Sequence, residues 1–152
     1  MLFRKQFPIA EALFAATLIS GLSFADSGPM ECTNNECTID YSDSRPLNLT
    51  LPKDVKKVSF SYNGSGRVKV KTQEPDTVID KLVINCVGSA RVDLAGVKAK
   101  EIKVKYRGSG DLDIFGKDKV VIQNSGSGDI NVSGTAKVEV TGHGSGKVGH
   151  EN

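Results

Sequence analysis

Two stretches of the chain decide its fold: residues 108–116 read GSGDLDIFG and residues 126–134 read GSGDINVSG. Related Gly-Ser-Gly or Gly-Ser-Ala copies begin at Gly64, Gly88 and Gly144, so successive copies start 24, 20, 18 and 18 residues apart. In the three central copies a second glycine follows eight residues after the first. A recurring motif of nearly constant spacing indicates that the chain builds one structural unit several times.

Each copy contains two short segments in which aliphatic and polar residues alternate, which is typical of β-strands with one buried face. After the glycine motif the apolar positions are Val68/Val70, Val92/Leu94, Leu112/Ile114 and Ile130/Val132. Before it they are Val58/Phe60/Tyr62, Leu82/Ile84/Cys86, Ile102/Val104/Tyr106, Val120/Ile122 and Val138/Val140. The sequence therefore predicts an all-β chain.

Two topologies fit this pattern, an antiparallel meander and a solenoid in which each repeat makes one coil. In a solenoid, equivalent positions stack about 4.8 Å apart, so glycine lies on glycine and aliphatic on aliphatic. A meander gives no reason for identical residues at an 18-residue period. We predict a single-domain β-solenoid of the parallel β-helix type with coils of about 18 residues, with corners that need backbone angles only glycine adopts without strain. The predicted corner residues are Gly64, Gly66, Gly88, Gly108, Gly110, Gly126, Gly128, Gly144 and Gly146.

The pattern Gly-Ser-Gly-Asp-aliphatic-x-aliphatic-x-Gly in residues 108–116 and 126–134 resembles the bacterial family named putative auto-transporter adhesin, head GIN domain. The resemblance covers about residues 58–148. It implies a right-handed β-helix-like fold on exported or surface proteins, with an adhesion role. The first two copies depart from the pattern, because Arg67 and Arg91 stand where residues 108–116 and 126–134 have Asp111 and Asp129.

The N-terminus has the features of a secretory signal. Arg4 and Lys5 precede an apolar run at residues 12–22, and residues 23–25 (SFA) place small side chains at the positions that signal peptidase reads. The run is too short to span a membrane, so we expect an exported protein, periplasmic, surface-bound or secreted, with no membrane span after processing. The predicted divisions are a signal peptide at 1–25, an N-terminal disulfide loop and cap at 26–57, the solenoid at 58–149 and a tail at 150–152.

Export permits disulfides, and the chain has three cysteines. Cys32 and Cys37 bracket a short polar segment, so we predict that they form a disulfide. Cys86 continues the apolar alternation of its segment and is predicted to face inward. A zinc site is not indicated, because neither a histidine nor a second cysteine pair lies at the usual spacing.

Composition excludes several classes of function. In 152 residues, Lys+Arg 20 against Asp+Glu 18 leave a formal charge of +2, which gives no support to a nucleic-acid partner. The two histidines, His143 and His150, lie in the last predicted coil and the tail, so no nucleophile has a base beside it. Phosphate-loop and dinucleotide motifs are absent from the sequence. We predict a protein without catalytic activity and without a cofactor.

One candidate metal site remains, on the outward face of the strands that follow the glycine motif. In the solenoid, four carboxylates converge there, and clustered carboxylates are ligands that Ca²⁺ prefers. They are Asp93, Asp111, Asp113 and Asp129. The alternative is a solvated face in which Arg91 offsets Asp111. The calcium-binding nonapeptide repeat does not fit, because Leu112 and Ile130 fall where its ligand Asp belongs.

These observations predict an exported, non-catalytic binding or adhesion-like module of the bacterial cell envelope, with an envelope protein or a glycan as partner. One alternative is a self-associating structural scaffold. Another is a polysaccharide-acting β-helix enzyme that uses Arg91, Asp93 and Asp111 on its outer face. Because the end of a solenoid exposes unpaired strand edges, and Val148 follows the last glycine corner, we expect homo-oligomer contacts at the C-terminal edge.

Overall fold

The computed structural model describes residues 28–152, so the predicted signal peptide lies outside the described residues. All regular structure in this part of the chain is β-strand. The strands are β1 (Met30–Thr33), β2 (Glu36–Tyr41), β3 (Leu47–Leu51), β4 (Lys57–Gly64), β5 (Arg67–Thr72), β6 (Val78–Gly88), β7 (Arg91–Gly108), β8 (Leu112–Asn124), β9 (Ile130–Ser133), β10 (Lys137–Thr141) and β11 (Val148–Glu151).

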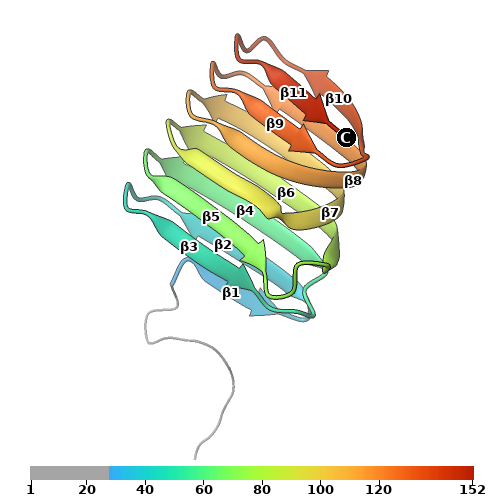
Figure 1. The fold of residues 1–152 in the computed structure, drawn as a ribbon. Helices are drawn as coiled ribbons and strands as arrows, with labels where there is room; N and C mark the ends of the chain where they lie inside the picture. Colours follow the sequence, from blue (N-terminus) through green and yellow to red (C-terminus); the bar gives the residue numbers. More distant parts are fainter. Residues whose placement is uncertain (1–27) are drawn as a thin grey trace, which may run out of the picture. The chain divides into compact units, whose positions relative to one another are not determined.

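Strands of successive repeats pair in parallel, which confirms the predicted β-solenoid (Figure 1). Val58 pairs with Leu82, Leu82 with Ile102, and Ile102 with Val120. The repeats make about six turns spaced about 20 residues apart. The early turns are longer than the predicted 18 residues, and the 18-residue period holds in the later ones.

Each coil has two broad sides that enclose a thin core. One side is formed by β2, β4, β6, the second half of β7, the end of β8, and β10. The other is formed by β3, β5, the first half of β7, the start of β8, β9 and β11. Alternate residues of both sides point inward and stack as columns of aliphatic side chains, with Leu94, Ile114 and Val132 forming one buried column. Cys86 lies buried in this core, as its alternation predicts, and its thiol is free.

The N-terminal segment is a coil of the solenoid, and the predicted boundary at residue 58 is therefore wrong. β2 pairs with β4 and β3 pairs with β5, both in parallel. Ile39 is buried and registers with Phe60. This coil keeps the inward alternation but lacks the Gly-Ser-Gly motif that marks the later copies.

The predicted disulfide between Cys32 and Cys37 is present. The disulfide links β1 to β2. The two residues between these strands, Asn34 and Asn35, both have positive φ (51° and 68°). Two such residues form the tight turn that joins hairpin strands. The hairpin places β1 beside β2, at the outer edge of the first coil.

The C-terminal residues also belong to the solenoid, and the predicted tail at 150–152 is wrong for two of its three residues. His150 and Glu151 are part of β11, where they register with Val132 and Ser133 of β9. Pairing with β9 continues past Val148, because all four residues of β9 have a partner in β11.

The corner glycines occupy the predicted corners, but the reason expected for them is wrong for most. Of the predicted set, Gly88 has a left-handed backbone (φ +119°) and the others do not. What they share is lack of space, because a Cβ on any of them would overlap backbone of the preceding coil. On Gly126 it would overlap the carbonyl oxygen of Gly108, and on Gly144 that of Gly126. These corners need glycine because each lies directly against the corner before it. Ala90 is the exception, because it stands at the position of Gly66 and Gly110 and its methyl group is accommodated in a buried site.

The first corner of the described chain supports this explanation. Asp43 and Arg45 stand at the positions that Gly64 and Gly66 occupy one coil later, since a Cβ on Gly64 would overlap the carbonyl oxygen of Asp43. The missing Cβ always faces the preceding coil. Within residues 28–152 no corner lies beneath Asp43 and Arg45, so side chains are accommodated there.

We expect Gly110→Ala to lower the free energy of unfolding by about 2 kcal/mol, in the range of overpacked core substitutions. Its Cβ would overlap the carbonyl oxygen of Ala90, and backbone cannot move aside as a flexible side chain can. The measurement is the midpoint of urea unfolding followed by circular dichroism. The control is Gly149→Ala, where the nearest atom to the new Cβ is 3.5 Å away. Equal midpoints for both variants would contradict close corner stacking.

Candidate functional site

The candidate site lies along the edge of the solenoid where the glycine corners stack, and buried polar side chains hold those corners from below. Tyr62 accepts a hydrogen bond from the Gly66 amide (2.8 Å) and donates one to the carbonyl of Asp43 (3.0 Å). Tyr106 donates to the carbonyl of Gly110. In the next coil the Asn124 side-chain oxygen accepts from the Gly126 amide (2.9 Å). The corner backbone is thus satisfied from inside the coil, as buried polar groups require.

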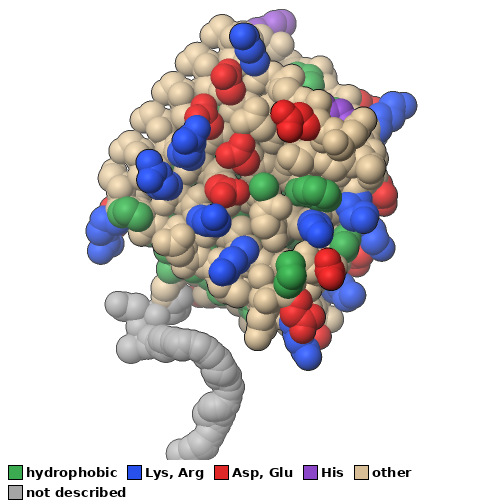
Figure 2. Space-filling view, in the orientation of Figure 1, with side chains coloured by type: hydrophobic (Ala, Val, Ile, Leu, Met, Phe, Trp, Pro, Cys, Tyr) green, Lys and Arg blue, Asp and Glu red, His purple; other side chains and the backbone are tan. Residues whose placement is uncertain are grey.

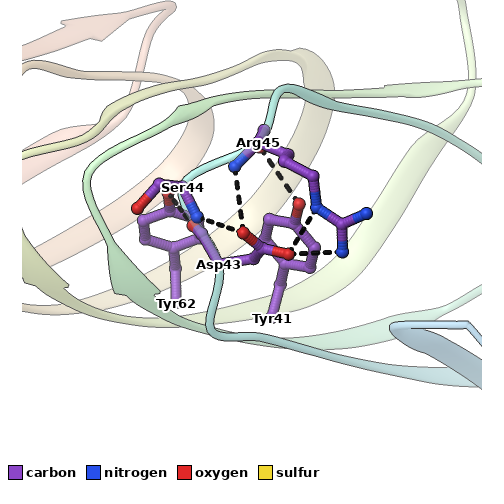
Figure 3. Close-up of polar contacts among 5 residues, drawn as sticks. All are labelled: Tyr41, Asp43, Ser44, Arg45 and Tyr62. Atoms are coloured by element: carbon purple, nitrogen blue, oxygen red, sulfur yellow. Dashed lines mark hydrogen bonds and ion pairs between the residues drawn. The ribbon is translucent and has the colours of Figure 1, made fainter.

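The first corner replaces glycine with a set of side-chain interactions (Figure 3). The Asp43 carboxylate accepts from the backbone amides of Ser44 (2.6 Å) and Arg45 (3.2 Å) and pairs with the Arg45 guanidinium, whose Nε donates at 2.6 Å. Tyr41 donates to the Arg45 carbonyl (3.0 Å). The Arg45 hydrogen bond, followed by the Ser44 amide, lowers the pKa of the Asp43 carboxyl. This corner is ordered by charge and local hydrogen bonds instead of by close backbone packing.

A shallow, open groove of about 690 Å³ follows the later corners. It crosses four coils, and its lining is mostly glycine and serine. The lining residues are Val87, Gly88, Ser89, Arg107, Gly108, Ser109, Ser125, Gly126, Ser127, His143, Gly144 and Ser145. The predicted corner glycines Gly88, Gly108, Gly126 and Gly144 therefore form its floor. In the view of Figure 2, an uncharged tan column runs along the edge where the corners of Figure 1 lie.

The groove has the chemistry of a surface that hydrogen-bonds an extended ligand. Ser89, Ser109 and Ser127 are exposed, and serine hydroxyls both donate and accept. Arg107 and His143 are also exposed and lie on the same lining. The groove is broad and open, in contrast to the enclosed clefts that bury a small molecule.

The structure brings the predicted acidic residues together in ladders but pairs them with other groups. Asp93 registers with Asp113, as the stacked coils require. Their partners are the neighbours in the ladder: Lys69 for Asp93 (3.6 Å), Arg91 for Asp111 (2.5 Å), the Asn131 amide for Asp113 (2.8 Å) and the Lys147 backbone amide for Asp129 (2.9 Å). Figure 2 shows both signs of charge side by side on this face.

This arrangement supports the solvated-face alternative. No group of three or more His, Cys, Asp or Glu side chains within residues 28–152 is close enough to hold a metal ion. The calcium hypothesis therefore gains no support from the geometry. Arg91 and Asp111, named for an enzyme site, form an ion pair with each other.

A family model described as "Putative auto-transporter adhesin, head GIN domain" matches residues 10–136. The chain belongs to this family. The match includes the first coil, which lacks the glycine motif, and so agrees with the structural finding that the solenoid begins before residue 58. No curated protein and no solved structure matches the chain.

Two features of the head GIN domain were not predicted from its sequence. One is the groove, which requires knowing that corners far apart in sequence lie side by side. The other is the tyrosine support, for which a signal exists, because Tyr41, Tyr62 and Tyr106 each precede their corner partner by four residues. A tyrosine four residues before the second corner position therefore indicates a hydrogen bond between its hydroxyl and the corner backbone.

The part of the head GIN domain that the structure describes contains no helix long and apolar enough to cross a membrane. The predicted C-terminal edge consists of β10 and β11, each of which has one strand partner. Val140 on β10 is half exposed at this edge (50%).

We expect Tyr106→Phe to lower the free energy of unfolding by about 1–2 kcal/mol, because it leaves the corner carbonyl of Gly110 without its donor. Tyr41→Phe is the matched control. Its hydroxyl bonds the Arg45 carbonyl at an exposed site, where water replaces the donor. Urea unfolding measures both variants. A loss as large for Tyr41→Phe as for Tyr106→Phe would contradict the supporting role of the buried hydroxyl.

Stability is expected to fall as the pH rises from about 9 to about 12. Burial raises the pKa of the Cys86 thiol from 9.0 to about 12, and burial together with the nearby Cys86 and Asp111 raises the pKa of Tyr106 from 10.0 to about 12. The unfolded chain therefore loses these protons first, so their contribution is complete below pH 9 and disappears as the pH passes 12. Thermal melting against pH measures the effect. In Cys86→Ala the decline should begin about one pH unit later, and an unchanged profile would refute the assignment to Cys86.

Proposed function

We propose that this head GIN domain is an exported, non-catalytic binding module that holds an extended ligand along the corner groove. The observation that carries the proposal is the groove itself, a polar surface that crosses four coils on a rigid floor of stacked glycines. The family description, an adhesin head domain, agrees with a role in binding. Export, with removal of residues 1–25, is part of the proposal.

The titratable groups support a role without catalysis. Catalytic sites concentrate residues with perturbed pKa values in a cleft. Within residues 28–152 the groups with shifted pKa values are Asp43, Arg45, Cys86 and Tyr106, and the first corner or the buried core accounts for each. Besides the tyrosines that support the corners, the buried polar side chains in residues 28–152 are Thr72 and Asn124, and both hydrogen-bond to nearby backbone.

A second candidate is a scaffold that self-associates through the C-terminal edge. It is favoured by the unpaired outer edges of β10 and β11 and by the exposure of Val140. Strand edges of this kind accept a further strand unless they are covered. In this function a second copy of the chain would be the partner.

The test is binding of the purified protein to a panel of immobilised neutral and acidic polysaccharides. We expect binding to at least one of them, and a loss of at least tenfold in Ser109→Phe/Ser127→Phe, because two phenyl groups would fill the groove. The control is Thr50→Phe/Gln73→Phe, which adds the same bulk at exposed positions outside the groove lining.

Two outcomes would refute the proposal. One is no binding to any polysaccharide of the panel together with concentration-dependent association in light scattering, which would favour the scaffold. The other is equal loss in the groove variant and its control. The protein recovered after export should begin at Asp26, and retention of residues 1–25 would contradict the export part.

A further inference from the structure

Three cations form a row on the outer surface of β7, on the side of the solenoid opposite the acidic ladders. Lys103, Lys105 and Arg107 alternate with inward residues of the strand and are all exposed. Along a strand, residues two apart lie about 6.6 Å from each other. The row therefore presents three positive charges in a straight line over about 13 Å.

The positions in register with the row on the neighbouring strands carry no compensating charge. The residues in register with it on β6 and β8 are all uncharged: Val83, Asn85, Val87, Val121 and Gln123. Among the described residues, none of the three cations forms an ion pair, whereas Lys69, Arg91 and Lys119 each pair with an acid. Glu101 lies on the same strand beyond Lys103, but its own registered neighbours are Lys81 and Lys119.

The row also leads into the corner groove. Arg107 lines the groove together with Val87, and the serine corners begin two residues further along the chain. The strands run across the stack of corners that the groove follows, so a linear ligand lying along β7 would meet the groove at Arg107 and turn there onto the serine hydroxyls. The amides of Asn85 and Gln123 flank its path and both donate and accept hydrogen bonds.

The composition of this surface favours a polysaccharide over a membrane. In the described residues, the exposed large hydrophobic side chains are Val83 (38%), Val87 (37%) and Val140 (50%). Proteins that lie on bilayers insert longer or aromatic side chains such as Leu, Phe and Trp. Binding of single-stranded nucleic acid similarly uses exposed aromatic rings for stacking. Short valines, amides, hydroxyls and a line of cations suit a chain of sugars that bears anionic groups.

We propose that Lys103, Lys105 and Arg107, together with the corner groove, bind a linear polysaccharide that carries carboxylate or sulfate groups. This inference rests on the proposed binding function and names its ligand class. The cations supply electrostatic attraction, which salt screens, and the groove supplies hydrogen bonds to sugar hydroxyls.

The test measures binding of the purified protein to alginate, a linear polyuronate, at low and high salt. We expect binding that weakens as salt increases, and a loss of at least tenfold in Lys103→Gln/Lys105→Gln/Arg107→Gln. The control is Lys53→Gln/Lys56→Gln/Lys117→Gln, which removes the same charge from exposed positions elsewhere. The control should bind within twofold of the unmodified protein. Dextran sulfate, a chain that carries sulfate and no carboxylate, distinguishes the sulfate source from the carboxylate source.

Three results would overturn the inference. Equal losses in the two triple variants would show attraction by net charge alone. Binding to phosphatidylglycerol vesicles but not to alginate or dextran sulfate would assign the row to a membrane. Binding to neutral dextran that is unchanged by the β7 triple variant but lost in Ser109→Phe/Ser127→Phe would refute the anionic ligand while leaving the proposed binding function intact.

Discussion

The structure depends on the close contact between the backbones of successive corners. At each corner glycine the missing Cβ faces the carbonyl oxygen of the preceding coil, as Gly126 faces Gly108. Parallel strands on both sides of the coil then keep the register that the corner imposes. A side chain at this position would separate the coils locally and weaken both ladders, because densely packed backbone cannot move aside without cost.

The same contact shapes the surface. Where corners must be glycine, the intervening residue is a serine with an exposed hydroxyl, and four such corners form a long, shallow groove. The narrow core below is filled by aliphatic side chains together with the hydroxyl of Tyr106 and the amide of Asn124. The outer faces of the two sides differ in how their charges are paired. The acidic ladders pair with Arg91 and Lys69, whereas Lys103, Lys105 and Arg107 face uncharged neighbours.

Much of the fold was predictable because its information is local and repeated. The spacing of the glycine motifs predicted a solenoid, and the short polar loop predicted the disulfide between Cys32 and Cys37. The ends were predicted less well. The first coil has the alternation of inward residues but not the corner glycines, since no described coil lies beneath its corner. At the other end, β11 extends past Val148 because its backbone pairs with β9. The role of the corner glycines was predicted wrongly, because the sequence suggested a need for unusual φ angles at single residues. The structure shows a need for space between two backbones, which depends on residues from two coils.

By itself the sequence determined the all-β class, the stacking of equivalent positions and which side chains point inward, since all three follow from a period along one chain. Tertiary structure alone decided the partners of each outward charge and the groove between coils. Both depend on the register of residues 18 to 24 positions apart, and on how closely two backbones approach. Asp111 forms an ion pair with Arg91, whereas Lys103 has only uncharged residues in register with it. The difference depends on the residues one coil away, and not on the residues next to Asp111 or Lys103 in the sequence.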